Sequence, residues 1–221
     1  YEQSRFCPDP AALLATLVAD IEAAGGGFRR APVSALAPAA ATVDVLAAGQ
    51  RHCFDRVVVA AGARSRPLAR SVGDDFPLDT ERGYHVMLPG RSGPELPVMA
   101  GEHHFVTSPM AEGVRLAGTS ELGGLRRAPD PRHYAALRRH AARLFPGLDT
   151  AGGSEWMGFR PTLPDSLPVI GPSPREPRVW YALGHQHLGL TLAGITGRLV
   201  ADGVAGRTPA VDLEPLRPDR F

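Results

Sequence analysis

The sequence contains no lysine and no asparagine, so all 24 residues counted together as Lys and Arg are arginines. Without a lysine, no side chain of this chain can form a Schiff base with a substrate or supply the ammonium group of a phosphate-binding P-loop. Enzymes that depend on either group are therefore excluded. The abundance of Ala, Arg, Gly and Pro is typical of biased genomic coding, so the arginines alone do not indicate a nucleic acid partner.

Charge and cysteine content exclude several further classes of protein. The 221 residues carry a formal net charge of +1, and 43% of them are hydrophobic, as in ordinary soluble globular proteins. The two cysteines, Cys7 and Cys53, are too few for a disulfide scaffold, which favours a reducing compartment. No apolar run approaches the roughly 20 residues of a membrane span, and the first residues lack the features of a signal peptide. We therefore expect a cytoplasmic protein.

The sequence contains none of four common catalytic and binding motifs. The sequence has no G-x-S-x-G, no H-E-x-x-H, no EF-hand loop and no G-x-G-x-x-G. An α/β nucleotide-binding protein normally carries the last of these on its first strand. We therefore expect this chain to start after that strand and to be a piece of a longer protein.

Hydrophobic periodicity predicts an α/β region at each end of the chain. Residues 11–24 have helical spacing, residues 28–36 and 42–47 favour strands, and the apolar run 54–63 suits a strand buried on both faces of a parallel sheet. A strand at 179–183 and a helix at about 188–205 end the chain.

Short strands separated by Pro, Gly and Ser predict an antiparallel sheet in the middle of the chain. The expected strands and the helix that follows them are residues 84–88, 96–100, 105–109, 114–119 and 131–145. We expect Tyr134, Leu137, Ala141 and Leu144 to line the buried face of that helix.

This order of elements predicts an α/β (α+β) fold with two interleaved domains, one an α/β domain and the other built on an antiparallel sheet. The expected boundaries are 1–75 for the first part of the α/β domain, 76–155 for the antiparallel domain and 156–221 for the C-terminal part of the α/β domain. Ligands commonly bind where such domains meet.

The strongest local signal is residues 181–193, where a buried strand runs into a glycine-bounded turn and then directly into a helix. The first N–H groups of that helix favour an anion or an electron-rich ring. The alternative is an ordinary turn with exposed histidines. A zinc site at His185 and His187 is disfavoured, because no third ligand accompanies them.

Arg160 and the pair Tyr84 and His85 are the other candidates. Arg160 lies among apolar residues, and a half-buried guanidinium suits a substrate carboxylate, although Asp165 or another local acid is an alternative partner. Tyr84 and His85 can face an active-site crevice, or they can be ordinary sheet residues. Residues 102–104 are expected to form a hairpin turn without chemistry.

Several segments together resemble the FAD-dependent D-amino-acid oxidase superfamily, most closely its bacterial D-amino-acid dehydrogenase, glycine oxidase-like and D-hydroxyproline dehydrogenase-like members. The resemblance runs through nearly the whole chain, and its order and spacing are specific. It is carried by residues 57–63, 77–85, 157–161, 184–191 and 216–220.

The resemblance implies that 1–75 and 156–221 form a partial FAD-binding, Rossmann-like domain, interleaved with an antiparallel-sheet substrate domain at 76–155. It also implies a set of FAD and substrate contacts. Val33 would lie near the adenine through its backbone, Ala61 and Gly62 near the adenosine pyrophosphate, and residues 184–191 around the flavin ring and ribityl chain. The FAD contacts in that last segment are Gly184, His185, Gln186, His187, Leu188, Gly189, Leu190 and Thr191. Arg160 would bind the substrate carboxylate, and Tyr84, His85 and His187 would line the catalytic pocket. We expect the turn at 184–187 and Arg160 to open onto one cleft.

The implied reaction is oxidation of a D-amino acid or related amino or imino acid by hydride transfer from Cα to FAD, with a dehydrogenase favoured over an oxidase. Arg160→Ala should chiefly raise KM for carboxylate substrates, by roughly 2–4 kcal/mol if the pair is desolvated. A dehydrogenase that passes electrons to a quinone would lie at the periphery of the inner membrane. No metal is expected.

The missing glycine-rich segment limits what these residues can do by themselves. We expect the isolated chain to bind FAD weakly or not at all, to be inactive, and to pair with the missing N-terminal segment or with itself through an uncovered sheet edge. The alternative function is a non-catalytic substrate-binding or assembly domain that needs a separate chain carrying the dinucleotide-binding half.

Overall fold

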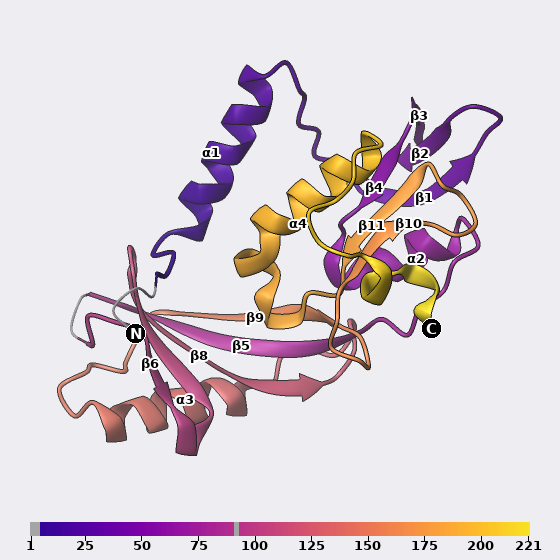
Figure 1. The fold of residues 1–221 in the computed structure, drawn as a ribbon. Helices are drawn as coiled ribbons and strands as arrows, with labels where there is room; N and C mark the ends of the chain where they lie inside the picture. The colour runs from indigo at the N-terminus through magenta and orange to yellow at the C-terminus, as the bar shows by residue number, and fades with distance from the viewer. Residues whose placement is uncertain (1–4, 91–92) are drawn as a thin grey trace. The chain divides into compact units, whose positions relative to one another are not determined.

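The computed structural model describes residues 5–90 and 93–221 (Figure 1). Its helices are α1 (Pro10–Ala23), α2 (Ser65–Arg70), α3 (Pro131–Leu144) and α4 (Gly189–Val204), with short 3-10 turns η1 (Gly62–Arg64), η2 (Gly101–His103), η3 (Gln186–Leu188), η4 (Glu214–Leu216) and η5 (Pro218–Arg220). Its strands are β1 (Val33–Pro38), β2 (Val43–Ala47), β3 (Gln50–Phe54), β4 (Val57–Val59), β5 (Asp79–Pro89), β6 (Val98–Ala100), β7 (Phe105–Met110), β8 (Gly113–Leu122), β9 (Ser154–Thr162), β10 (Val169–Pro172) and β11 (Val179–Leu183).

The described chain forms two compact units. Unit 1 comprises the described parts of 1–30, 82–122 and 126–158, and unit 2 comprises 31–81, 123–125 and 159–221. The mixture of helices and open sheets confirms the α/β (α+β) class that the sequence predicts. The three predicted domain boundaries stay predictions.

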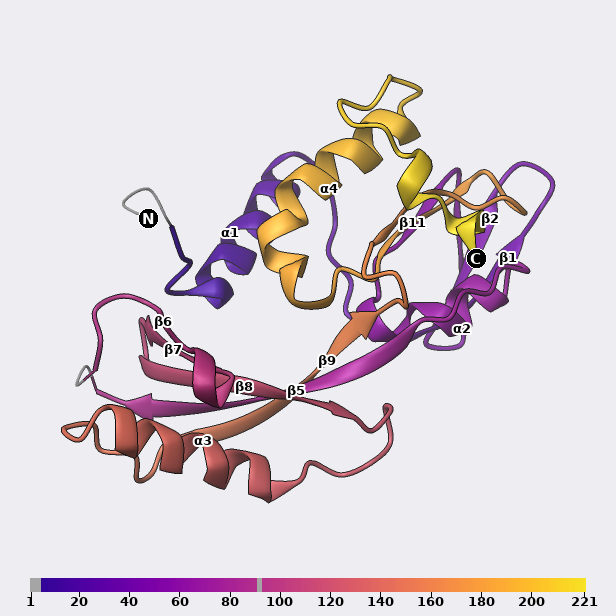
Figure 2. The same cartoon turned by 60° about the horizontal axis from the view of Figure 1, so that its bottom comes forward.

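Unit 1 is built on a five-stranded sheet in the order β6-β7-β8-β5-β9, with α3 along one face (Figure 2). Strands β6, β7 and β8 are antiparallel to one another, as predicted. Alternate residues of β5 and β8 point toward α3 and form the core. The buried residues of this core include Tyr84, Val86, Leu88, Val114, Leu116, Tyr134, Leu137 and Ala141. Leu144, which was expected on the buried face, is 45% exposed, because it lies in the last turn of α3.

Helix α1 forms where the periodicity predicts it. The Asp9 side chain accepts a hydrogen bond from the Ala12 N–H, Pro10 occupies the first turn, and Gly25 follows the helix with a φ of 84°. Its apolar face is nevertheless open, since α1 has no buried residue and Leu14 is 59% exposed. The periodicity therefore predicted the helix correctly but not its burial.

Unit 2 contains two three-stranded sheets. One is antiparallel, in the order β1-β2-β3, and the other has the order β10-β11-β4 with β4 parallel to β11. Side chains from both sheets share a core, which includes Leu36, Val43, Val59, Phe76, Val169 and Tyr181. Helix α4 covers the second sheet, where Leu199 and Val200 contact Ile170 and Trp180.

The apolar run at 54–63 is a correction. Only Val57–Val59 forms a strand, and Val58 is 44% exposed, so burial on both faces is wrong. The reason is that β4 is the outer strand of its sheet. Residues 50–53, which the sequence analysis did not assign, form β3 together with Phe54 and pair with β2. Among the described residues, no helix is long and apolar enough to cross a membrane.

Candidate functional site

Two glycine-containing turns of unit 2 follow adjacent parallel strands. Strand β4 pairs with β11 in the register Val57↔Val179 and Val59↔Tyr181, so both strands end at the same edge of the sheet. Gly62 lies just beyond the end of β4, and Gly184 directly after β11. In open α/β sheets, ligands bind outside the carboxyl ends of parallel strands. The structure therefore brings together the two segments that the resemblance assigns to FAD.

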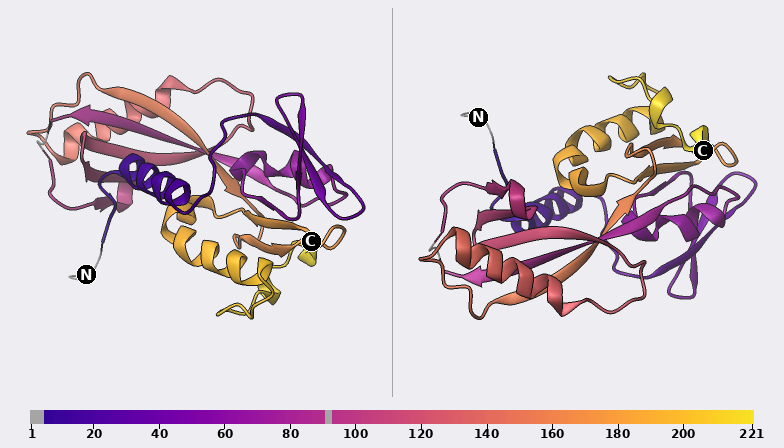
Figure 3. Two further views of the ribbon diagram at one scale, coloured as in Figure 1. Left: turned by 90° about the horizontal axis from the view of Figure 1, so that it is seen from above. Right: turned by 90° about the horizontal axis from the view of Figure 1, so that it is seen from below.

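The turn after β11 leads through η3 into α4, and Figure 3 shows this connection in the orange part of the ribbon. Gly184 is buried with a φ of 81°, and a Cβ there would collide with the Leu163 side chain. Helix α4 has no side-chain cap at its start, and Gly189, Leu190 and Thr191 are exposed. The first N–H groups of α4 are thus available to an anion or a polar ring.

The two histidines of this turn have different surroundings. The His185 ring is half-buried, and its Nε2 lies 3.0 Å from the Thr196 hydroxyl of α4. Burial lowers the pKa of His185, so its ring favours the neutral form. His187 and Leu188 are exposed. His185 therefore fixes the turn to α4, whereas His187 faces outward.

The turn after β4 is open. Gly62 has a φ of 56°, and no atom lies within 4 Å of the position that a Cβ would take. Close approach of a ligand to this backbone is therefore sterically possible. The Arg64 guanidinium lies 6.0 Å from the centre of the Phe159 ring, which places this turn near the strand that carries Arg160.

Val33 and Ala61 are both accessible. Val33 begins β1, an outer strand of the antiparallel sheet, and is 42% exposed. The register of β1 with β2 shifts between Val33 and Ala35. Ala61 is exposed immediately before η1. Elsewhere on β1 the Leu36 N–H donates a hydrogen bond to the Ser71 hydroxyl. The contact of Val33 with FAD stays a prediction.

Arg160 is half-buried on β9 in unit 2. Burial lowers the pKa of Arg160, and the Glu81 carboxylate of the adjacent strand β5 opposes this shift. Asp165, the expected alternative partner, instead accepts hydrogen bonds from Arg220, with Nε at 2.7 Å. The local acid that acts on Arg160 is therefore Glu81, which the sequence analysis did not identify.

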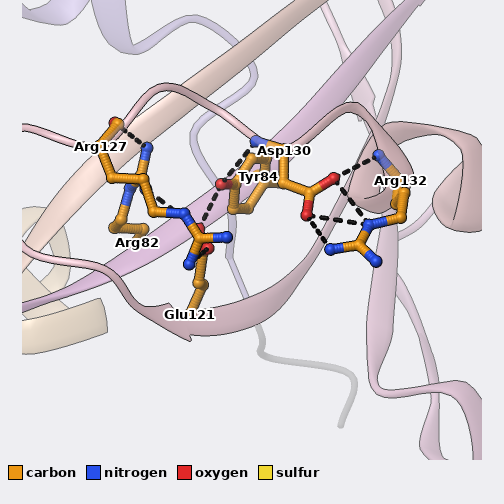
Figure 4. Close-up of polar contacts among 6 residues, drawn as sticks. All are labelled: Arg82, Tyr84, Glu121, Arg127, Asp130 and Arg132. Atoms are coloured by element: carbon orange, nitrogen blue, oxygen red, sulfur yellow. Dashed lines mark hydrogen bonds and ion pairs between the residues drawn. The ribbon is translucent and has the colours of Figure 1, made fainter.

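Tyr84 lies in the covered core of unit 1. It is 1% exposed, its hydroxyl donates a hydrogen bond to Glu121 at 2.5 Å, and it accepts one from the Asp130 N–H at 3.2 Å. Arg82 is fully buried, and its Nη1 lies 3.2 Å from Oε2 of Glu121. Its Nη2 donates a hydrogen bond to the Arg127 carbonyl at 2.7 Å. Burial and the bond with Glu121 raise the pKa of Tyr84. Figure 4 shows this network with Arg132, which pairs with Asp130.

His85 lies on the opposite face of the same sheet, which we call the open face. Its half-buried ring stacks on Trp156 of β9, with ring centres 4.9 Å apart and planes 25° apart. Burial and the positive charge of Arg115 on β8 lower the pKa of His85. The sequence analysis gave Trp156 and Arg115 no role. The alternation of Val114, Arg115 and Leu116 was the signal that could have placed Arg115 on this face.

Comparison with known proteins identifies the family. The model of the FAD dependent oxidoreductase (DAO) family matches residues 1–203. The chain belongs to this family. This confirms the resemblance stated on the sequence motifs, and FAD is the cofactor on which the family depends.

Individual relatives agree with the family assignment. The chain is 40% identical to a D-amino-acid oxidase of Bradyrhizobium diazoefficiens over 100% of its own length and 54% of that protein. It is 38% identical to a D-amino acid dehydrogenase of Paramagnetospirillum magneticum, over 74% of this chain and 40% of that protein. The glycine oxidase structure from Geobacillus kaustophilus is similar with a TM-score of 0.84 and 28% identity, covering 95% of this chain and 57% of that one. The chain thus spans about half the length of the curated relatives it matches.

The predicted site residues divide between the two units. Val33, Ala61, Gly62, Arg160 and residues 184–191 belong to unit 2, whereas Tyr84 and His85 belong to unit 1. A common cleft for the turn at 184–187 and Arg160 stays a prediction, as do the individual roles of these residues.

Proposed function

We propose that the complete protein oxidises D-amino acids or related imino acids, with FAD as its cofactor and a dehydrogenase reaction favoured over an oxidase reaction. The observation that carries the proposal is the common edge of β4 and β11, where the turns at Gly62 and Gly184 follow adjacent parallel strands. Membership of the FAD dependent oxidoreductase family supports it.

The residues at this edge fit FAD by their chemistry. The open backbone at Gly62 allows the pyrophosphate to approach, and the uncapped start of α4 offers N–H donors to the polar edge of the flavin. Bound here, FAD would supply the acceptor for the hydride of the substrate Cα, and the resulting imine would hydrolyse to a keto acid. The G-x-G-x-x-G segment that the sequence lacks would come from residues outside these 221.

In this proposal the side chains of the chain bind and orient the substrate. The Arg160 guanidinium holds the α-carboxylate through paired N–H donors, and its half-buried position strengthens the attraction by reducing solvation. His85 and His187 contact the substrate, and the lowered pKa of His85 keeps its ring uncharged near neutral pH. Orientation of the substrate by these side chains supplies much of the rate enhancement, so the reaction does not require a general acid and general base pair.

The proposed function is tested by anaerobic mixing of the flavin-loaded complete protein with D-amino acids and imino acids. We expect loss of the visible flavin absorbance and formation of the keto acid. Reoxidation by an artificial dye but slowly by oxygen would support a dehydrogenase, and fast reoxidation by oxygen would show an oxidase. No loss of flavin absorbance with any amino or imino acid would contradict the proposal.

Arg160 provides a sharper test of the substrate site. Arg160→Met should raise KM for carboxylate substrates by roughly a hundredfold, because it removes a charge-assisted pair, and should leave kcat less affected. Arg220→Met is the matched control, since Arg220 pairs with Asp165 in the same unit and KM should not change. An unchanged KM in Arg160→Met would remove Arg160 from the site.

A further inference from the structure

The turn between β11 and α4 holds two residues in the left-handed backbone region. Gly184 has a φ of 81° and Gln186 a φ of 49°. This conformation is ordinary for glycine but costs free energy at Gln186, which has a Cβ. Such a conformation persists only where neighbouring contacts hold it. The geometry of residues 184–188 therefore depends on the contacts that the turn makes with the rest of unit 2.

His185, between these two residues, makes such a contact. Its ring is half-buried, and its Nε2 lies 3.0 Å from the Thr196 hydroxyl, within hydrogen-bonding distance. Thr196 is 7% exposed and precedes Leu199 and Val200 by one helical turn, so it lies on the face of α4 that packs on the β10-β11-β4 sheet. The His185 carbonyl also accepts a hydrogen bond from the Leu188 N–H at 2.9 Å. His185 therefore joins the turn to the buried side of α4 through its ring and to the end of η3 through its carbonyl.

The surroundings of His185 suit an uncharged ring. Burial lowers the pKa of His185, which favours the neutral form near neutral pH. A neutral imidazole carries one donor and one acceptor nitrogen, and a hydroxyl can pair with either. On the other side of the turn, His187, Leu188 and Gly189 are exposed. The turn therefore has an inner side bonded to α4 and an outer side open to a ligand.

We propose that His185 and Thr196 are positioning residues for FAD, because their hydrogen bond holds residues 184–188 in the conformation that the cofactor requires. This inference rests on the proposed function, which places FAD at this turn. Neither side chain needs to touch the cofactor or the substrate. Without the bond, FAD would have to order the turn as it binds, and its affinity would fall by the cost of that ordering.

Two substitutions of Thr196 in the complete protein separate the hydrogen bond from the packing. Thr196→Val keeps the shape of the side chain and removes the hydroxyl, whereas Thr196→Ser keeps the hydroxyl. We expect Thr196→Val to weaken FAD binding roughly tenfold and Thr196→Ser to keep nearly the wild-type affinity. Thr80→Val is the matched control and should not change FAD affinity. Thr80 is 2% exposed in the same unit, and its hydroxyl has no hydrogen-bond partner among the described residues.

Hydrogen exchange of the Leu188 N–H in the flavin-free complete protein reports on the turn directly. We expect this exchange to be roughly tenfold faster in Thr196→Val than in the wild type, and unchanged in Thr80→Val. The N–H groups of β11 should exchange as in the wild type, which separates opening of the turn from loss of global stability.

Unchanged exchange of the Leu188 N–H in Thr196→Val would overturn the inference, as would wild-type FAD affinity in that variant or an equal loss of affinity in Thr196→Ser. A protein that shows the expected differences in exchange and FAD affinity but oxidises no amino or imino acid would support the positioning pair and contradict the proposed function. A wild-type complete protein that binds no FAD would overturn both.

Discussion

Neighbouring residues of β5 have different side-chain partners on the two faces of the unit 1 sheet. On the covered face, the polar groups of Tyr84, Arg82 and Glu121 bond to one another. On the open face, His85 stacks on Trp156, and the cation of Arg115 has no anionic partner among the described residues. Polar groups that bond to one another inside the core stabilise the fold, whereas the half-buried side chains of the open face are partly accessible to solvent. The comparison predicts stability effects on the first face and substrate effects on the second.

The largest stability effect is expected for Arg82→Met. This change removes a fully buried guanidinium, leaves the Arg127 carbonyl without its donor and takes a buried cation from the Glu121 carboxylate, which keeps the hydrogen bond from Tyr84. Breaking such a buried pair should destabilise the protein by about 3 kcal/mol, measured by urea unfolding. Arg132→Met is the control, because that arginine is exposed and its pair should contribute nothing measurable. Equal effects of the two changes would contradict the distinction.

A smaller loss of stability is expected for Tyr84→Phe. The ring remains in the core, but the Asp130 N–H loses its acceptor and Glu121 loses a donor, so the cost should be about 1 kcal/mol. The reference is Tyr134→Phe, which alters a buried tyrosine of α3 in the same core. If Tyr84→Phe instead changed substrate KM with no loss of stability, Tyr84 would belong to the substrate pocket as the resemblance implies.

A still smaller stability effect is expected for His85→Ala, since His85 lies outside the core on the open face. We expect a change of less than about 0.5 kcal/mol in unfolding free energy at neutral pH. The same variant should change KM for the amino acid substrate several-fold. A large loss of stability with unchanged kinetics would assign His85 to the fold.

The pH dependence of His85 gives the finest test of the open face. Its pKa in the folded protein is lowered from the ordinary value of 6.5, so the unfolded chain binds more protons as the pH falls below 6.5. The contribution of His85 to stability is therefore present above pH 6.5 and is lost as the pH falls through the lower folded value. Arg115→Met should raise the pKa of His85, as followed by the NMR signal of its ring. A pKa that does not rise would show that Arg115 has no effect on His85.

The strand and helix positions were largely predictable because they depend on local patterns. Alternation predicted the antiparallel strands, and the spacing of Leu137 and Ala141 predicted the buried face of α3. Burial was less predictable. The apolar run 54–63 predicted a strand buried on both faces, but β4 is the outer strand of its sheet, a position that depends on its pairing with β11, far along the chain.

The candidate site was predictable in its turns but not in its side-chain partners. Gly184 and the start of α4 follow from residues close in sequence. In contrast, the pairing of Asp165 with Arg220 and the proximity of Glu81 to Arg160 join distant segments. The facing of Tyr84 and His85 was predictable from the alternation of β5, because Val86 and Leu88 are buried on the same face as Tyr84.

Flavin retention by two aspartate variants of the complete protein tests the central claim most directly, namely that the carboxyl ends of β4 and β11 hold FAD. Gly62 and Gly49 both have positive φ, of 56° and 76°, and at both a Cβ would meet no atom within 4 Å. Aspartate tolerates this backbone conformation, and at Gly62 its charge would repel the pyrophosphate. The account predicts at least a roughly tenfold loss of bound flavin in Gly62→Asp and normal flavin content in Gly49→Asp. Full flavin content in Gly62→Asp would contradict it.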